Sequence, residues 1–307
     1  MIVLVVAAFF YLGAQLAARI QGPETTSPLE RASAAALLGA SIWIAVNWIL
    51  SAPHWLNGPA LLVSAGIAAV TAFLLRRPRV ERVAISRAWL ILVPMAIWIA
   101  FALWRAYVLP VVGDDAFIYH MPRAVLLWRA GGYTWVPNAP DIRINAFAAN
   151  YELLVADVLA VQHADTIAEW TSVLFFVLLL LVSAAVACRW WGEGKHLFAV
   201  PYLVATIPIV ILHTGAIKND VMSHFFALSA LLWGGRWFST RRFSDAALCI
   251  VALFAGLGTK NHLLLLVGIF GVIFFFRSLP INRSSLTFFI RLTAVAVIAF
   301  LLLGGVH

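Results

Sequence analysis

The chain has 307 residues, of which 64% are hydrophobic and 11% are charged, and its mean hydropathy is +0.97. This composition is too apolar for a water-soluble domain and is typical of a polytopic membrane protein. The formal net charge of +8 does not indicate a nucleic-acid partner, because the basic residues are spread over short loops between apolar runs, in the pattern of membrane topology.

Apolar runs of roughly 15 to 25 residues, long enough to cross a bilayer as helices, recur along the chain. We therefore predict an all-α polytopic membrane protein with about ten transmembrane helices. The first run has no basic residue before it and is predicted to be a retained span rather than a cleaved signal. The predicted spans are residues 1–18, 33–52, 60–75, 89–109, 171–188, 197–213, 221–235, 244–258, 263–276 and 288–304.

These spans define three regions of the chain. Residues 1–88 hold three spans, residues 89–276 form a membrane module with a long outer loop at 112–170, and residues 277–307 hold the last span. The chain stops as that span ends, which is the pattern expected of a truncated protein.

The 21 Lys and Arg residues divide unequally between alternate loops. If the arginine-rich stretch 76–87 is cytoplasmic, strict alternation places most basic residues inside and most acids outside. By the positive-inside rule, the loop 112–170 then faces the periplasmic or extracytoplasmic side of the inner (plasma) membrane, and both chain ends lie outside. The basic residues assigned to the inside are Arg19, Arg31, Arg76, Arg77, Arg79, Arg82, Arg87, Arg189, Lys195, Arg236, Arg241, Arg242, Arg277, Arg283 and Arg291.

The long outer loop is polar and aromatic where the spans are aliphatic. Apolar residues at near-helical spacing over 115–130 predict a helix that lies in the membrane interface and ends at the two glycines 131–132. A second interfacial helix is predicted over 152–163. Its acids Glu152 and Asp157 are five positions apart, about 140° around the helix axis, so they are not expected to share a face.

Three polar segments converge on the predicted outer side and define a candidate site. Carboxylates at a membrane edge carry a desolvation penalty and therefore mark a functional site by default. Here they could deprotonate an acceptor hydroxyl, while Arg and Lys hold a phosphate leaving group. The residues of this candidate site are Asp114, Asp115, Tyr119, His120, Arg123, Asn219, Asp220, Lys260, Asn261 and His262.

Four motifs follow one another on this predicted outer side. They are Asp115-Ala-Phe-Ile-Tyr119 with His120-Met-Pro122-Arg123, then Arg143 with Glu152, then Asn219-Asp220-Val-Met-Ser-His-Phe225-Phe226, and last Gly256-Leu257-Gly-Thr-Lys260-Asn261. In this order they resemble the GT-C class of integral-membrane glycosyltransferases, especially the bacterial group similar to dolichyl-phosphate-mannose protein mannosyltransferases. The resemblance covers about residues 90–275.

The resemblance implies an inverting transfer of a sugar from a polyprenyl-phosphate donor to a hydroxyl acceptor at the outer leaflet, the acceptor being a lipid, a glycan or a protein. It gives Asp115 the role of general base or its equivalent, and Asp220 a role at the acceptor or a cation. Lys260 and Arg123 become candidates for the donor phosphate. The other substrate-binding candidates are Tyr119, His120, Arg143, Glu152, Asn219 and Asn261.

The chain departs from the GT-C pattern at two positions. A tryptophan found in one subset of that family is replaced by Asp114, and the second acid often found after the loop aspartate is replaced by Ala116. Asp114 is therefore expected to substitute as the second catalytic acid. The resemblance leaves a divalent cation open, no His or Cys cluster has the spacing of a zinc site, and no other cofactor is predicted. The predicted partners are the lipid-linked donor and membrane lipids.

Each candidate residue also has a purely structural interpretation. Asp115 and Asp220 are preferred N-cap residues for the helices that follow them. Lys260 has the length to reach lipid headgroups from a helix end, and Arg123 can bind headgroups non-specifically. Glu152 fits a first-turn acid that is favoured by the helix dipole.

Tyr119 and His120 have a structural alternative as well, as members of an interfacial aromatic belt. Most of the many tryptophans fit interface anchors. Four further acids are expected to be solvated, namely Asp141, Asp157, Asp165 and Glu169.

Two alternatives to transfer stay open. A transporter or lipid flippase would bind a cation or proton at Asp115 and Asp220, with such acids at mid-depth on broken helices. The second alternative is a non-catalytic scaffold protein of the same fold.

Overall fold

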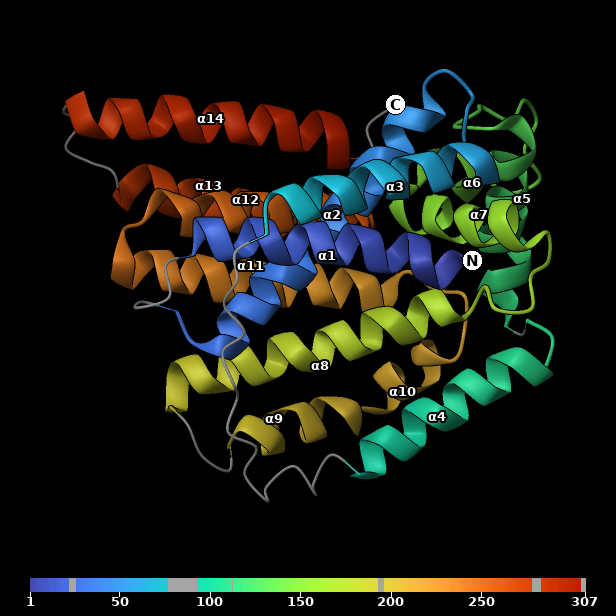
Figure 1. Cartoon of the computed structure of the whole chain (residues 1–307), viewed down its shortest axis with the longest axis horizontal. Helices are drawn as coiled ribbons and strands as arrows, with labels where there is room; N and C mark the ends of the chain where they lie inside the picture. The colour runs from blue at the N-terminus through green and yellow to red at the C-terminus, as the bar shows by residue number, and fades with distance from the viewer. Residues whose placement is uncertain (22–25, 77–92, 112, 193–195, 278–282, 305–307) are drawn as a thin grey trace.

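A computed structural model describes residues 1–21, 26–76, 93–111, 113–192, 196–277 and 283–304, which form helices and loops without strands. The predicted all-helical class is confirmed for these residues. The described residues do not include the start of the predicted span 89–109 or the predicted region boundary at 88/89. They also lack five basic residues that were assigned to the inside, namely Arg77, Arg79, Arg82, Arg87 and Lys195. Figure 1 shows the arrangement of the helices. They are α1 (Ile2–Ile20), α2 (Pro28–Ser51), α3 (Gly58–Leu74), α4 (Val93–Val108), a π-helix η2 (Ala116–His120), α5 (Met121–Ala130), α6 (Arg143–Ala146), α7 (Asn150–Gln162), α8 (Trp170–Trp191), α9 (His196–Ala205), α10 (Pro208–Thr214), α11 (Asp220–Thr240), α12 (Phe243–Leu257), a 3-10 helix η3 (Asn261–Leu263), α13 (Leu264–Arg277) and α14 (Arg283–Leu303).

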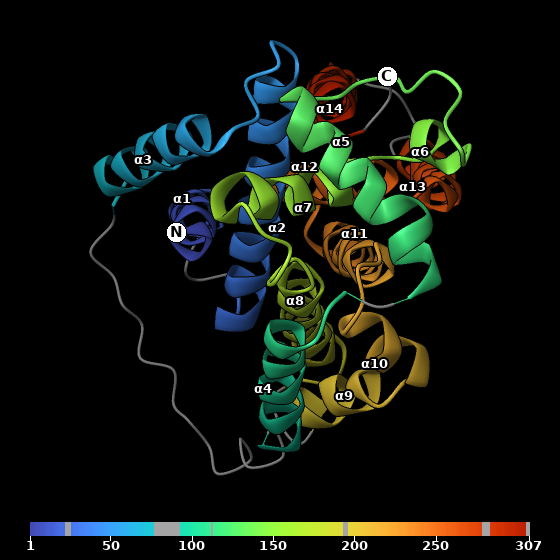
Figure 2. The same cartoon turned by 90° about the vertical axis from the view of Figure 1, so that its right-hand side faces the viewer.

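The long helices lie side by side, so that the connections between them gather at the two ends of the bundle (Figures 1 and 2). One end, here called the site end, carries the connections 52–57, 109–169, 215–219 and 258–260. The opposite end, here called the arginine end, carries 240–242. Among the described connections, those predicted to lie outside are therefore at the site end, and 240–242, predicted to lie inside, is at the arginine end.

Candidate membrane spans are fewer than the sequence predicts. Among the described residues, four helices are long and apolar enough to cross a bilayer, namely α1, α2, α8 and the part of α14 from Leu286 to Leu303. The pair formed by α9 and α10 would be a fifth, although it is bent by 75°. The structure thus supports an α-helical membrane protein with four to five spans, and the number ten stays a prediction.

A proline explains the break between α9 and α10. Pro208 has no backbone N–H and disfavours a helical conformation of the residue before it. Ile207 accordingly adopts φ −65° and ψ 119°, an extended conformation, and Pro208 starts the new helix. The predicted continuous span 197–213 is therefore two short helices.

Helix α2 lies at the centre of the bundle, with α1 on one side and α7, α8, α12 and α14 around it. Its indole groups are tied to polar side chains of α7. Trp43 Nε1 donates to Asp157 Oδ2 at 2.6 Å, and Trp48 Nε1 donates to Asn150 Oδ1 at 2.8 Å. Both tryptophans are buried, so the prediction that they anchor at the membrane interface is wrong for these two.

Helix α7 differs from the amphipathic interfacial helix that was predicted. Each residue from Asn150 to Val161 is buried. A helix that is apolar all round is a core helix rather than a surface helix. The predicted angular separation of its two acids is nevertheless met, because Glu152 contacts His120 while Asp157 contacts α2.

A buried ionic network holds the arginine end together. Arg236 of α11 is fully buried and bonds to Asp245 of α12 and Glu30 of α2, at 3.1 and 2.6 Å. Gln21, after α1, also donates to Asp245. Because unpaired buried charges are costly, this network links α2, α11 and α12 firmly at the end opposite the candidate site.

Helices α1 and α2 approach each other through two glycines. A Cβ atom added at Gly13 would lie 2.5 Å from the backbone nitrogen of Gly39. Small residues at such a crossing allow the helix backbones to touch, as in the interfaces of membrane helices.

Candidate functional site

The candidate site lies at the site end, where the chain leaves α4. The two adjacent aspartates, Asp114 and Asp115, precede the π-helix η2, which continues directly into α5. Pro122, the second residue of α5, has no backbone N–H and follows the π-helix directly. The helix ends at Gly131, as predicted, and this glycine adopts the left-handed conformation with φ +71°. Short π-helical segments occur frequently at functional sites.

Asp115 is held by two cations from distant parts of the chain. Its Oδ1 accepts from Arg143 Nη1 of α6 at 3.1 Å, and Lys218 Nζ lies 3.0 Å from Oδ2. Arg143 is fixed in turn by Asp141, to which its Nε and Nη2 donate at 2.9 and 2.8 Å. The carboxylate is partly exposed, at 37% of its side-chain surface.

Asp220, at the start of α11, makes a second set of ionic contacts. It pairs with Lys260, which follows α12, and Nδ1 of His213 lies 3.2 Å from its Oδ2. The preceding residue, Asn219, donates to the backbone oxygen of Thr259 at 2.8 Å. This bond joins the connections 215–219 and 258–260 and so keeps Asp220 opposite Lys260.

Lys218 connects the two aspartates, because it pairs with Asp115 and precedes Asp220 by two residues. Tyr119 lies against the same group, with the guanidinium carbon of Arg143 at 4.4 Å from its ring centroid. Burial raises the pKa of Tyr119, and the carboxylates of Glu152 and Asp115 raise it further. We call this group the charged cluster, and its members are Asp115, Asp141, Arg143, His213, Lys218, Asp220 and Lys260.

The charged cluster is close to electrically neutral, with three carboxylates facing three permanently charged cations. Burial alone would raise the pKa of Asp115, but hydrogen bonds and charges from Lys218 and then Arg143 outweigh it and hold the pKa below the usual 3.8. Asp115 is therefore ionised at neutral pH. Asp115 can act as a base only when Lys218 and Arg143 pair with another anion instead.

His120 and Glu152 form a buried pair behind the cluster. Nδ1 of His120 lies 2.6 Å from Oε1 of Glu152, and the two side chains are 1% and 0% exposed. The ring of His120 also lies 4.0 Å from that of Tyr119, centroid to centroid. The predicted belt position of Tyr119 and His120 is therefore wrong, since both are buried within the protein.

Arg123 does not reach lipid headgroups. It is 3% exposed and donates to the backbone oxygen of Ala148 at 3.2 Å. In this arrangement it fixes α5 to the segment before α7. Arg143, Lys218 and Lys260 are the cations on the accessible side of the site.

The N-cap interpretation of the two central aspartates is wrong. Asp115 occupies the cap position of η2 without a side-chain hydrogen bond to that helix. At α11 the cap residue is Asn219, also without one, and Asp220 is the first helical residue. Both carboxylates contact side chains of other segments instead.

Two of the four acids predicted to be solvated are buried. Asp157 is 0% exposed and contacts α2, and Glu169 is 3% exposed and pairs with Arg105 at 2.7 Å. Asp165 is exposed as predicted. The remaining candidates, Asp114, Asn261 and His262, are also exposed.

Sequence reasoning missed three members of the charged cluster, Lys218, His213 and Asp141, the last of which was expected to be solvated and instead pairs with Arg143. Lys218 and His213 lie in or next to the polar connection before Asp220, and their proximity to that aspartate was the available signal. Among the described residues, no group of three or more His, Cys, Asp or Glu side chains is placed to hold a metal ion.

The chain was compared with known proteins at three levels. No model of a protein family matches it, no curated protein matches it, and no solved structure matches it.

Proposed function

We propose that this protein transfers a sugar from a polyprenyl-phosphate donor to a hydroxyl acceptor at the outer leaflet of the membrane. The observation that carries the proposal is the charged cluster itself. Two aspartates from separate segments share one end of a helical bundle with three cations. The GT-C-like motifs supply most of these residues.

The cluster suits an anionic substrate because its cations are already neutralised by exchangeable partners. A phosphate monoester or diester competes with Asp115 and Asp220 for Lys218, Arg143 and Lys260. When the phosphate takes over these cations, the carboxylate of Asp115 loses the contacts that lower its pKa and becomes a stronger base. Donor binding would thus activate the base.

The proposed reaction then follows with balanced bonds. Asp115 accepts the proton of the acceptor hydroxyl, whose oxygen forms a bond to the anomeric carbon of the sugar. The bond from that carbon to the phosphate oxygen breaks, and the electron pair leaves with the phosphate. The negative charge that develops on the phosphate is stabilised by the cluster cations.

The test is a transfer assay in which purified protein is offered radiolabelled polyprenyl-phosphate sugars. Asp115→Asn keeps the shape of the side chain but removes the base, so transfer should fall by at least about 100-fold. The matched control is Asp165→Asn, an exposed acid of the same outer loop that lies outside the charged cluster. Its activity should equal that of the wild type.

Two results would count against the proposal at different levels. Transfer by Asp115→Asn at the wild-type rate would show that Asp115 is not the general base, without contradicting the proposed function. Absence of transfer from every donor by folded wild-type protein would contradict the function itself.

Transport is the second candidate function, and the broken helix pair favours it. The helices α9 and α10 are bent by 75°, and α10 ends beside the site with His213 next to Asp220. Discontinuous helices of this kind form ion sites in transporters. A proton or cation flux in proteoliposomes that requires Asp220, without sugar transfer, would select this alternative.

A further inference from the structure

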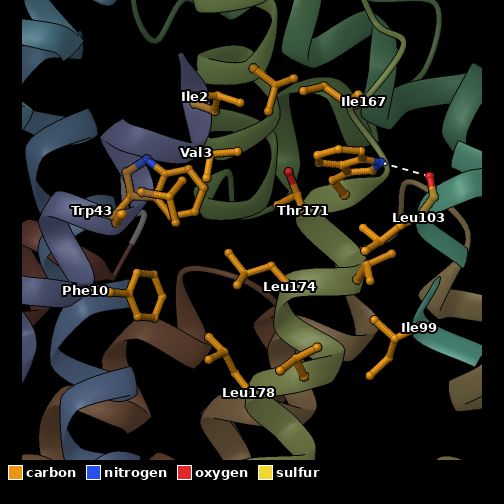
Figure 3. Close-up of a pocket in the computed structure, with 16 residues that line it drawn as sticks. Ile2, Val3, Phe10, Trp43, Ile99, Leu103, Ile167, Thr171, Leu174 and Leu178 are labelled. Atoms are coloured by element: carbon orange, nitrogen blue, oxygen red, sulfur yellow. Dashed lines mark hydrogen bonds between the residues drawn. The ribbon is translucent and has the colours of Figure 1, made fainter. Parts of the chain in front are cut away.

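The apolar pocket on the flank of the bundle does not select a ligand by its chemistry. It lies between α1, α4 and α8 with a volume of about 390 Å³, and none of the described residues that line it is charged. Figure 3 shows apolar side chains such as Phe10, Leu174 and Ile99 around it. Specificity needs a few placed polar groups, and such groups are found at the site end, around Asp220.

Three histidines from separate segments surround Asp220. His213 is in α10, and its Nδ1 lies 3.2 Å from Oδ2 of Asp220. His224 follows Asp220 by four residues in α11, which places both side chains on one face of that helix. His262 is in η3, two residues after Lys260, the residue that pairs with Asp220. We call His213, His224 and His262 the histidine group.

The histidine group can be reached from outside the protein. His224 and His262 are exposed, and the side chains of His213, Asp220 and Lys260 keep 14%, 20% and 29% of their surface accessible. Nδ1 of His213 makes no hydrogen bond with any described residue, despite its short distance to Asp220. The ring of His213 is therefore free to take up a proton at that nitrogen.

The charges that act on the histidine group nearly cancel when its rings are neutral. They come from two carboxylates and two ammonium groups, namely Asp115, Asp220, Lys218 and Lys260. Partial burial of its ring, and then the charge of Lys260, hold the pKa of His262 below the usual 6.5. Histidine is the side chain that ordinarily titrates between pH 5 and 8. Each proton taken up by the group therefore adds a positive charge that nothing in the cluster balances.

An anion suits this arrangement better than a metal ion. Histidine and aspartate are common metal ligands, but the described residues place no three such groups to hold a metal. The ammonium group of Lys260 also contacts the carboxylate of Asp220 and would repel a metal cation. Protonated imidazoles and ammonium groups carry only hydrogen-bond donors, which is what the oxygens of an anion require.

We propose that the histidine group and Lys260 bind a divalent oxyanion of the phosphate-monoester class, and that the histidines take up protons as the anion binds. Because the complex then holds more protons than the free protein, binding must strengthen as the pH falls through the histidine range. A phosphate monoester carries about two negative charges near neutral pH, whereas a diester carries one. The polyprenyl phosphate released by transfer is such a monoester, and this identification alone rests on the proposed function.

The test measures sulfate binding to the detergent-purified protein by NMR, with histidine labelled with carbon-13 at Cε1. Sulfate is the probe because it stays divalent while phosphate itself titrates near pH 6. If one proton is taken up, affinity should be about tenfold higher at about pH 5.5 than at about pH 7.5. Sulfate should also raise the pKa of the histidine group relative to sodium chloride of equal ionic strength.

A triple variant that joins His213→Gln, His224→Gln and His262→Gln keeps Lys260 and removes the titrating rings. At about pH 7.5 it should bind sulfate as the wild type does, and the gain on acidification should disappear. His224→Gln alone changes an exposed side chain and should lower the affinity at about pH 5.5 about threefold.

The matched control is His163→Asn, which removes an exposed histidine outside the histidine group. His163 has φ +55°, a left-handed conformation that asparagine tolerates, so this variant should keep the full pH dependence. Equal sulfate affinity of the wild type at the two pH values would overturn the proposal, and so would an unchanged pH dependence in the triple variant. Since the test uses neither donor nor acceptor, either result would leave the proposed transfer uncontradicted, and absence of transfer would not contradict this site.

Discussion

Lys218 has more influence on the protonation of Asp115 than any other single residue of the charged cluster. It supplies the largest of the interactions that lower the pKa of that carboxyl, and Arg143 adds to it. A carboxyl whose folded pKa is depressed contributes stability above its unfolded pKa of 3.8 and loses it as the pH falls through the lower folded value. The ion pairs of Asp115 are thus complete throughout the neutral range.

At the residue scale, we predict that Lys218→Gln raises the pKa of Asp115. The acidic limb of the pH profile of transfer should then move to higher pH. The same shift should be visible in the carboxyl resonance of Asp115 in protein labelled with carbon-13 at aspartate. Because NMR reports protonation directly, this measurement stands even if the reaction proposed for the site is wrong.

The control for this shift is Arg129→Gln, which removes an exposed charge from the end of α5. Arg129 is not a member of the charged cluster, and the pKa of Asp115 should not change. An unchanged pKa in Lys218→Gln would show that the contact with Lys218 is absent in solution.

The sequence predicted the acids of the site better than their surroundings. Asp115 and Asp220 stand out because carboxylates are rare in so apolar a chain, and both lie in the charged cluster. The cations that pair with these carboxylates were harder to predict, because they come from segments distant in sequence. The contact of Lys218 with Asp115 spans about a hundred residues and has no local pattern, which is why it was missed.

At the scale of single elements, α7 shows how polar groups can specify the packing of an apolar helix. Asn150 donates through Nδ2 to the backbone oxygens of Ala255 in α12 and Leu303 in α14, at 3.1 and 2.8 Å. It also accepts from Trp48 of α2. A single side chain therefore fixes the start of α7 against three helices.

We predict that Asn150→Ala lowers the free energy of unfolding by about 1 to 3 kcal/mol, because it leaves the buried indole N–H of Trp48 without its acceptor. Thermal unfolding in detergent measures the change. The control is Gln162→Ala at the other end of α7, which is partly exposed. Equal melting temperatures of Asn150→Ala and the control would contradict this role of Asn150.

The positions of the helices were predicted well, because apolar runs and helix breakers act locally. Gly131 ends α5 as predicted, and Pro208 interrupts a span in a way that the sequence already allowed. The burial of α7 was missed. A stripe of apolar residues was assigned to one face, whereas apolar residues surround the whole helix, and the tertiary packing that covers them has no signature of its own.

At the scale of the whole molecule, the two ends of the bundle differ in chemistry. The site end carries the partly exposed charged cluster, and the arginine end carries a buried network around Arg236. In the orientation that we predict from the positive-inside rule, the arginine end faces the cytoplasm and the site end faces outside.

This orientation predicts the outcome of cysteine labelling in intact cells. Cys188 and Cys249 are first replaced by alanine. Asp114→Cys, exposed at the site end, should react with a membrane-impermeant maleimide added outside, and Arg241→Cys, exposed at the arginine end, should react only after permeabilisation. The opposite labelling pattern would show that the protein has the opposite orientation in the membrane, and it would contradict the proposed reaction at the outer leaflet.

The contact of Gly13 with Gly39 limits how closely α1 and α2 can approach each other. Since the two backbones already touch there, α1 cannot move nearer to the central helix α2, and any side chain added at either glycine would force the two helices apart.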